Sequence, residues 1–92
     1  EHSFFDLYGR VEEIIKHHRD RMDEMLIQVK TAPKTAWEIS SRITWNVAPW
    51  EELTPRTRRM ALMETLAHLR HMVLAGELAE TSSDTAVFYQ AI

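Results

Sequence analysis

The segment from Thr54 to Gly76 carries its own helix start and stop signals. Thr54 can cap a helix, Pro55 suits the first helical position, and Gly76 suits the position just past the end. At about 100° per residue, the apolar side chains between them form two stripes about a third of a turn apart. These stripes are Leu62, Leu66, Leu69 and Val73, and Met60, Met63, Ala67 and Leu74. A helix apolar over so wide an arc packs against neighbours on two sides, so we predict a central helix over 54–75.

A second long helix is predicted from residue 10 to about residue 30, because apolar side chains recur there at spacings of three and four. Its stripe is Val11, Ile14, Ile15, His18, Met22, Met25, Leu26 and Val29. His18 falls inside the stripe and is predicted to be a core histidine. Arg21 is predicted to pair with Glu24 on the outer face. Residues 1–9 show no helical period and end in glycine, so we expect an irregular lead-in from a preceding domain, although Asp6 could also cap the helix.

Between the two long helices, the sequence predicts a short helix and a loop. Thr35 and Glu38 have the spacing of a capping box, so a helix should begin at Thr35 and run to about Thr44. Its inward face is predicted to be Trp37, Ile39 and Ile43, with Trp45 at the corner. Pro49 interrupts the following loop over 46–53, which Trp50 and Leu53 should anchor to the core.

Two short extended segments, 77–81 and 86–92, flank the turn-forming residues 82–85 and predict a β-hairpin. The order is long helix, short helix, long helix and β-wing. This is the order of a winged helix-turn-helix, so we predict a mostly α fold with a small hairpin over residues 10–92.

Size and composition narrow the classes of function. A chain of 92 residues holds one modest core, and its net charge of −3 argues against a protein that mainly neutralises phosphates. The absence of cysteine excludes disulfides, thiolate metal sites and cysteine nucleophiles, and it fits a cytoplasmic protein. No apolar run reaches membrane-spanning length, and no signal peptide opens the chain. Because the sequence starts at Glu1 without methionine, we expect it to be part of a longer chain.

Four arginines of the predicted central helix are candidates for contact with a partner or with nucleic acid: Arg56, Arg58, Arg59 and Arg70. In a DNA-binding winged helix, such side chains would read duplex DNA from the 54–75 helix. The predicted wing opposes this function, since it carries only acidic charges, at Glu77, Glu80 and Asp84. Nucleic acid is therefore the less favoured partner, and ion pairs or a protein interface are the favoured interpretation.

The polar face of the central helix is narrow and carries Glu64, Thr65, His68 and His71. Glu64, His68 and His71 are spaced by four and three residues, close enough to share a metal ion. The pattern matches no H-E-x-x-H motif, so we interpret these residues as solvated polar groups. Nothing resembles a catalytic triad or a phosphate-binding loop, and we assign no catalytic, cofactor-binding or metal-binding residue in this chain.

Three runs, residues 9–21, 33–39 and 63–69, resemble in order the C-terminal winged-helix-like domain of metallo-β-lactamase-fold hydrolases. The resemblance implies a preceding αββα hydrolase domain that holds zinc or a similar divalent metal through an H-x-H-x-D-H motif, which is absent here. His2 lies near the expected place of the last metal ligand, but the family's glycine-flanked context is missing, so His2 is not assigned.

The function that this resemblance implies is that of a non-catalytic accessory domain. Such a domain packs beside the catalytic domain and shapes substrate access or oligomer contacts, so a homo-oligomer is a further possibility. The aromatic lead-in and the arginines would then face a partner. The alternatives from the residues alone are a DNA-binding winged helix and a helical dimerisation module.

Overall fold

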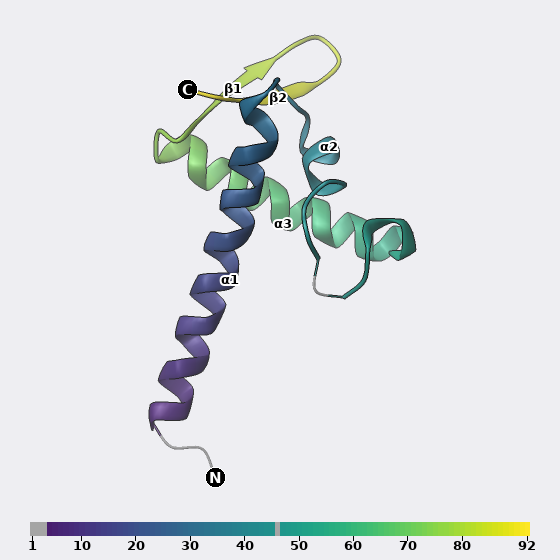
Figure 1. The fold of residues 1–92 in the computed structure, drawn as a ribbon. Helices are drawn as coiled ribbons and strands as arrows, with labels where there is room; N and C mark the ends of the chain where they lie inside the picture. The colour runs from purple at the N-terminus through teal and green to yellow at the C-terminus, as the bar shows by residue number, and fades with distance from the viewer. Residues whose placement is uncertain (1–3, 46) are drawn as a thin grey trace.

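The chain forms two long helices, one short helix and a terminal hairpin in a computed structural model that describes residues 4–45 and 47–92 (Figure 1). The elements in order are α1 (Phe4–Lys30), α2 (Ala36–Ser40), the 3₁₀ turn η1 (Trp50–Glu52), α3 (Pro55–Leu74), β1 (Leu78–Ser82) and β2 (Val87–Ala91). This is the mostly α, winged helix-turn-helix-like fold that the sequence predicts. Each end of the two predicted hairpin segments lies one residue from the corresponding end of the observed strand.

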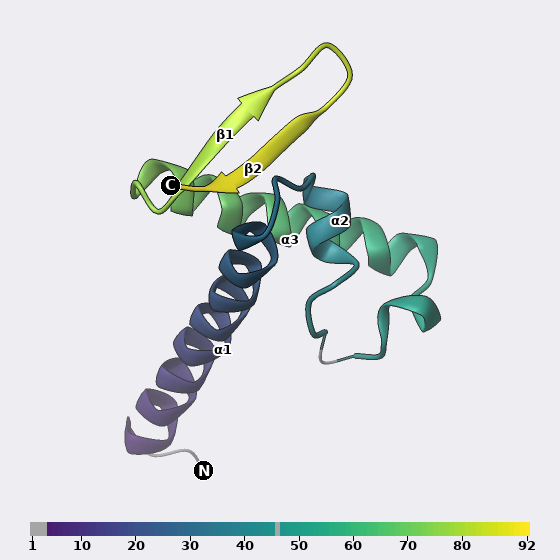
Figure 2. The same ribbon diagram turned by 45° about the horizontal axis from the view of Figure 1, so that its top comes forward.

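The central position of α3 is confirmed, because α1, α2 and β1 all contact it (Figures 1 and 2). Its start is as predicted: the Thr54 hydroxyl accepts from the Thr57 backbone N–H at 3.2 Å, and Pro55 is the first residue. At its end, Gly76 has a φ of 79°. The Glu77 N–H donates to the Met72 carbonyl at 2.8 Å, which closes the helix as the left-handed glycine cap allows.

The expectation that neighbours cover both apolar stripes of α3 is wrong for the second stripe. Its buried residues are Ala61, Thr65, Leu69 and Met72, whereas Met60, Met63, Ala67 and Leu74 of the second stripe are exposed. Thr65, predicted on the polar face, is fully buried and its hydroxyl donates to the Ala61 carbonyl at 2.9 Å. A threonine can satisfy its hydroxyl within its own helix, so it costs little to bury.

One hydrophobic core joins the second half of α1 to the other elements. Its members are Met25, Val29, Ala36, Ile39, Ile43, Leu69, Met72, Leu78 and Tyr89. Only the last turns of α1 enter this core, because every residue from 9 to 20 is exposed. Figures 1 and 2 show this first half of α1 projecting away from the rest of the domain.

The irregular lead-in is not observed where the structure describes it, because α1 already begins at Phe4. Gly9 therefore lies inside the helix, and Asp6 is not at its start. A glycine inside a helix costs only about 1 kcal/mol relative to alanine, so a strongly helical neighbouring segment can extend through it. Residues 1–3, including His2, lie outside the described residues.

The capping box of α2 is confirmed, but α2 ends at Ser40 and not near Thr44. Serine hydroxyls compete with the helical ladder here: Ser41 Oγ donates to the Glu38 carbonyl at 2.7 Å. The Thr44 hydroxyl donates to the Glu24 carboxylate of α1 at 2.7 Å, which draws the chain out of the helix. Trp37 is half exposed and not inward, and its ring packs edge-on against Trp50 with centroids 5.2 Å apart.

We predict that Thr35→Ala destabilises the domain by about 1 kcal/mol, because it removes the acceptor that caps α2. The hydrogen bonds from the Thr35 backbone and hydroxyl lower the pKa of Glu38. The stabilising contribution of the Glu38 carboxylate is therefore fully present above its unfolded-state pKa, and it is lost as the pH falls through its lower folded-state pKa.

Glu38→Gln should keep much of the cap of α2 but remove this loss of stability in acid. Urea unfolding at neutral and acid pH measures the free energy of unfolding of Thr35→Ala, Glu38→Gln and the parent chain. If stability fell equally with pH in Glu38→Gln and in the parent chain, the prediction for Glu38 would be wrong.

The hairpin is fixed to the helices by a backbone bridge. Lys34, in the connection between α1 and α2, donates its N–H to the Tyr89 carbonyl at 3.0 Å and accepts from the Tyr89 N–H at 2.8 Å. The side-chain ammonium of Lys34 donates to the Gln28 carbonyl, one of the last carbonyls of α1. The strands pair antiparallel from Leu78 opposite Ala91 to Ser82 opposite Val87.

Candidate functional site

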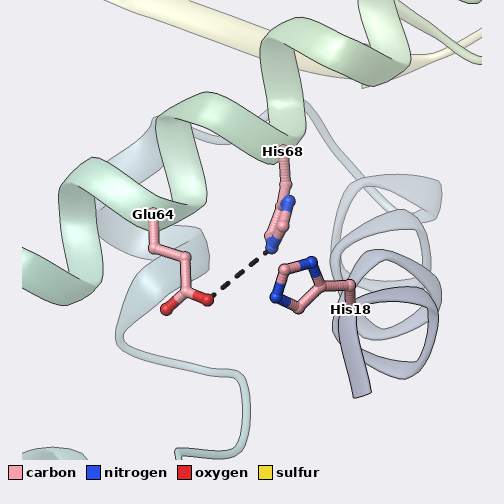
Figure 3. Close-up of side chains that lie close together, drawn as sticks. All are labelled: His18, Glu64 and His68. Carbon is pink, nitrogen blue, oxygen red and sulfur yellow. Dashed lines mark ion pairs between the residues drawn. The ribbon is translucent and has the colours of Figure 1, made fainter. Parts of the chain in front are cut away.

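The polar residues that could carry chemistry meet where α1 crosses α3. His18 of α1 approaches Glu64 and His68 of α3, as Figure 3 shows. One potential ligand atom from each side chain lies within 4.8 Å of the other two. Glu64 and His68 share a face because they are four residues apart. We call these three residues the crossing cluster.

Arg21 lies one turn after His18 and holds the crossing together. Its Nη1 donates to Glu64 Oε1 at 2.6 Å, and the two side chains are only 16% and 35% exposed. The guanidinium also lies over the Trp45 ring, 5.1 Å from the ring centroid. The predicted Arg21–Glu24 pair is therefore replaced by a pair that joins α1 to α3.

His68 is the most unusual titratable group of the cluster. Its burial lowers its pKa, nearby His18 adds to this, and Glu64 opposes it. The ring is therefore neutral at pH 7, so the 3.8 Å contact between His68 Nε2 and Glu64 Oε1 is not an ion pair there. This distance is also too long for a hydrogen bond. Among the described residues, no group forms a hydrogen bond with this buried nitrogen.

The sequence identified two members of this cluster and missed the third. Glu64 and His68 do share a face, but His71 is exposed and lies outside the group. His18 is exposed as a residue, and its ring stacks edge-on against His68 with centroids 5.0 Å apart, so it is not the core histidine predicted. His18 and Arg21 are three residues apart, so the sequence places them on one face of α1. Only the crossing of the two helices in the structure brings that face to Glu64 and His68 of α3.

The four candidate arginines have different environments. Arg56, Arg59 and Arg70 are exposed. Arg58 is half-buried, donates through Nε to the Trp50 carbonyl at 3.1 Å, and stacks over the Trp50 ring at 5.2 Å. Arg58 therefore anchors the loop before α3 to the helix, while the other three are accessible to a partner.

An open groove of about 360 Å³ lies beside the Arg21–Glu64 pair. Its walls are mainly apolar and include Trp45, Leu53 and Met60. Leu53 is buried, which confirms it as an anchor of the loop, whereas Trp50 is only partly covered. The groove therefore combines a mainly apolar lining with the Arg21–Glu64 ion pair.

Two apolar surfaces remain uncovered. The first lies on the projecting half of α1 and consists of Val11, Ile14 and Ile15; we call it the α1 stripe. The second lies on α3 and includes Met60, Met63 and Leu74. Apolar surface in contiguous stripes is typical of an interaction site, in contrast to single scattered residues.

None of the helices within residues 4–45 and 47–92 combines the length and hydrophobicity that crossing a membrane requires.

The two long helices, the short helix and the terminal hairpin define a mostly α, winged-helix-like domain. Its structure is similar to part of the crystal structure of a β-lactamase domain protein from Burkholderia ambifaria, with a TM-score of 0.78 and 29% sequence identity. The similarity covers 91% of this chain but only 24% of that protein, so the chain spans about a quarter of its length. No protein-family model matches the chain, and no curated protein does.

Proposed function

We propose that this chain is a non-catalytic accessory domain, C-terminal to the catalytic domain of a cytoplasmic metallo-β-lactamase-fold hydrolase. The observation that carries the proposal is the similarity over 91% of this chain to 24% of a β-lactamase domain protein. A chain that matches a quarter of a larger protein corresponds to one of its parts. The zinc or similar metal of the hydrolase would belong to the preceding domain, outside these residues.

The α1 stripe supports a specific mode of packing. Val11, Ile14 and Ile15 are exposed on the half of α1 that leads toward the N-terminus, which is where a preceding domain would be joined. Burying apolar surface gains about 25 cal/mol per Å², so covering this stripe would favour a fixed arrangement of the two domains. Packing there places the accessory domain beside the catalytic domain, where it can shape substrate access or oligomer contacts.

DNA binding is less well supported. Arg58 is engaged with the loop before α3. Negative charge lies on the wing at Glu80 and Asp84 and just before it at Glu77, and all three residues are exposed. A duplex-binding wing would need positive charge to displace counterions from phosphates.

Ile15→Glu in the parent chain should loosen the contact between the two domains, because it places a charge in the α1 stripe. Ile27→Glu is the matched control: Ile27 is the same residue type on the same helix, 59% exposed against 60% for Ile15, but at the other end of α1. In the isolated domain, both variants should change stability by no more than about 0.5 kcal/mol. In the parent chain, only Ile15→Glu should speed proteolysis at the domain junction and separate the thermal unfolding of the two domains.

The parent chain is defined by reading the coding sequence upstream of Glu1. A hydrolase domain there requires roughly 200 further residues with an H-x-H-x-D-H motif. A start codon directly before Glu1 would overturn the proposed function. If the motif is present but Ile15→Glu and Ile27→Glu behave alike, the family assignment stands and packing through the α1 stripe is wrong.

A further inference from the structure

We propose that the crossing cluster is a binding site for a divalent transition-metal ion, with zinc as the best match, that joins α1 to α3. The ligands would be one ring nitrogen of His18, one carboxylate oxygen of Glu64, and Nε2 of His68. The inference does not rest on the proposed function, because all three ligands belong to this chain. It is also separate from the metal of a hydrolase domain, whose H-x-H-x-D-H motif this sequence lacks.

The spacing of the three ligand atoms suits a small ion. Zinc binds nitrogen and oxygen at about 2.0–2.2 Å, so neighbouring ligand atoms of a tetrahedral site lie roughly 3.3–3.5 Å apart. In the crossing cluster, His68 Nε2 and Glu64 Oε1 are 3.8 Å apart, and all three atoms lie within 4.8 Å of one another. Binding of an ion would therefore require side-chain rotations that bring the three ligand atoms closer together. The ligands come from two helices, with His18 on α1 and with Glu64 and His68 on α3, and the three side chains point toward one another (Figure 3).

His68 Nε2 provides an independent reason to expect a ligand. It is buried and has no hydrogen-bond partner among the described residues, and its side chain is only 13% exposed. A buried polar atom without a partner costs about 1–3 kcal/mol, so such atoms are rare. A metal ion between Glu64 and His18 would give this nitrogen the partner that the protein does not.

The donor set selects the chemical class of the ion. Two imidazole nitrogens and one carboxylate oxygen favour zinc and similar transition metals over calcium or magnesium, which prefer oxygen ligands. Three protein ligands leave a fourth position for water or for a group from a partner. Such a site could bind a partner's side chain as well as fix the angle between α1 and α3.

Arg21 is the main opposing charge, because its Nη1 bonds to Glu64 Oε1, the same oxygen that lies 3.8 Å from His68 Nε2. A carboxylate has about four acceptor positions on its two oxygens, so Glu64 can bind Arg21 and an ion together. The Arg21 guanidinium also stacks on the Trp45 ring, so a second contact besides Glu64 holds it in place. We therefore expect Arg21 to weaken the affinity without blocking the site.

Calorimetric titration of zinc chloride into the 92-residue chain tests the site, together with thermal unfolding in zinc and in EDTA. We expect one saturable site and a higher Tm in zinc. His18→Ala and His68→Ala should each weaken binding by at least about tenfold, since even loss of a supporting contact to a ligand costs about 10–100-fold. His17→Ala is the matched control, because His17 is an adjacent exposed histidine outside the cluster, and it should bind zinc as the parent chain does.

Three results would overturn the site: no saturable binding to the parent chain, equal binding by all variants, or loss of binding in His17→Ala alone. Circular dichroism checks that each variant is folded. If His68→Ala does not fold, His18→Ala decides, because His18 is exposed and outside the hydrophobic core. Cobalt(II) gives a second readout: intense visible absorption typical of tetrahedral coordination should form in the parent chain and in His17→Ala, and it should be lost in His18→Ala.

Discussion

Leu69→Ala is expected to destabilise the domain by about 3–4 kcal/mol, because it leaves a cavity at the centre of the core. Leu69 is 0% exposed and belongs to the cluster that joins α1, α2, α3 and the hairpin. Domains typically have about 0.05–0.15 kcal/mol of stability per residue, so a chain of this size has only roughly 5–14 kcal/mol to lose. The variant should therefore unfold at a much lower urea concentration than the parent chain.

Leu74→Ala provides the control on the same helix. Leu74 is 75% exposed, so the same truncation should change stability by no more than about 0.5 kcal/mol. Urea unfolding followed by circular dichroism measures both variants. Similar losses for the two leucines would mean that the exposed stripe of α3 is covered in solution, for example by a second copy of the chain. A loss below about 1 kcal/mol for Leu69→Ala would contradict the core described here.

Tyr89→Ala is the second substitution expected to have a large effect, of about 3–5 kcal/mol. Tyr89 is buried in the core, and its backbone forms both hydrogen bonds to Lys34. An isolated two-stranded hairpin is marginal in water, so loss of this ring should release the hairpin from the helices. Hydrogen exchange at the Lys34 and Tyr89 amides should quicken together with the loss of global stability.

Tyr89→Phe separates packing from the hydroxyl. Burial raises the pKa of Tyr89, and the charge of Glu80 on the paired strand adds to this, so the hydroxyl is protonated at neutral pH. Removing it should cost no more than about 1.5 kcal/mol, the net worth of one hydrogen bond. If Tyr89→Phe were as damaging as Tyr89→Ala, the hydroxyl and not the buried ring would be what holds the hairpin.

Features set by neighbours in the sequence could be predicted well. The capping box of Thr35 and Glu38, the cap at Thr54 and the left-handed Gly76 all depend on backbone groups within a few residues. The hairpin followed from turn residues between two short extended runs. These features need no knowledge of how the elements pack, so their residue types are sufficient evidence.

Features set by the crossing of the helices could not be predicted. Periodicity identifies an apolar face but not how much of it the neighbours cover, so the exposed second stripe of α3 and the buried Thr65 were assigned incorrectly. The candidate site likewise contains residues that local spacing identifies and residues that only the packing of the helices brings to it. Glu64 and His68 follow from helical spacing, but His18 and Arg21 reach them only because α1 crosses α3 at that level.

The unbroken course of α1 from Phe4 to Lys30 makes the number of its residues as important as their identity. Each helical residue advances the chain by about 1.5 Å and rotates it by about 100°. One residue inserted among the exposed positions 9–20 would leave the core intact, yet it would turn everything N-terminal to it by more than a quarter of a revolution. A single deletion would turn it the opposite way. In this half of the helix, the number of residues therefore sets the direction in which the N-terminal end of α1 and its exposed side chains face.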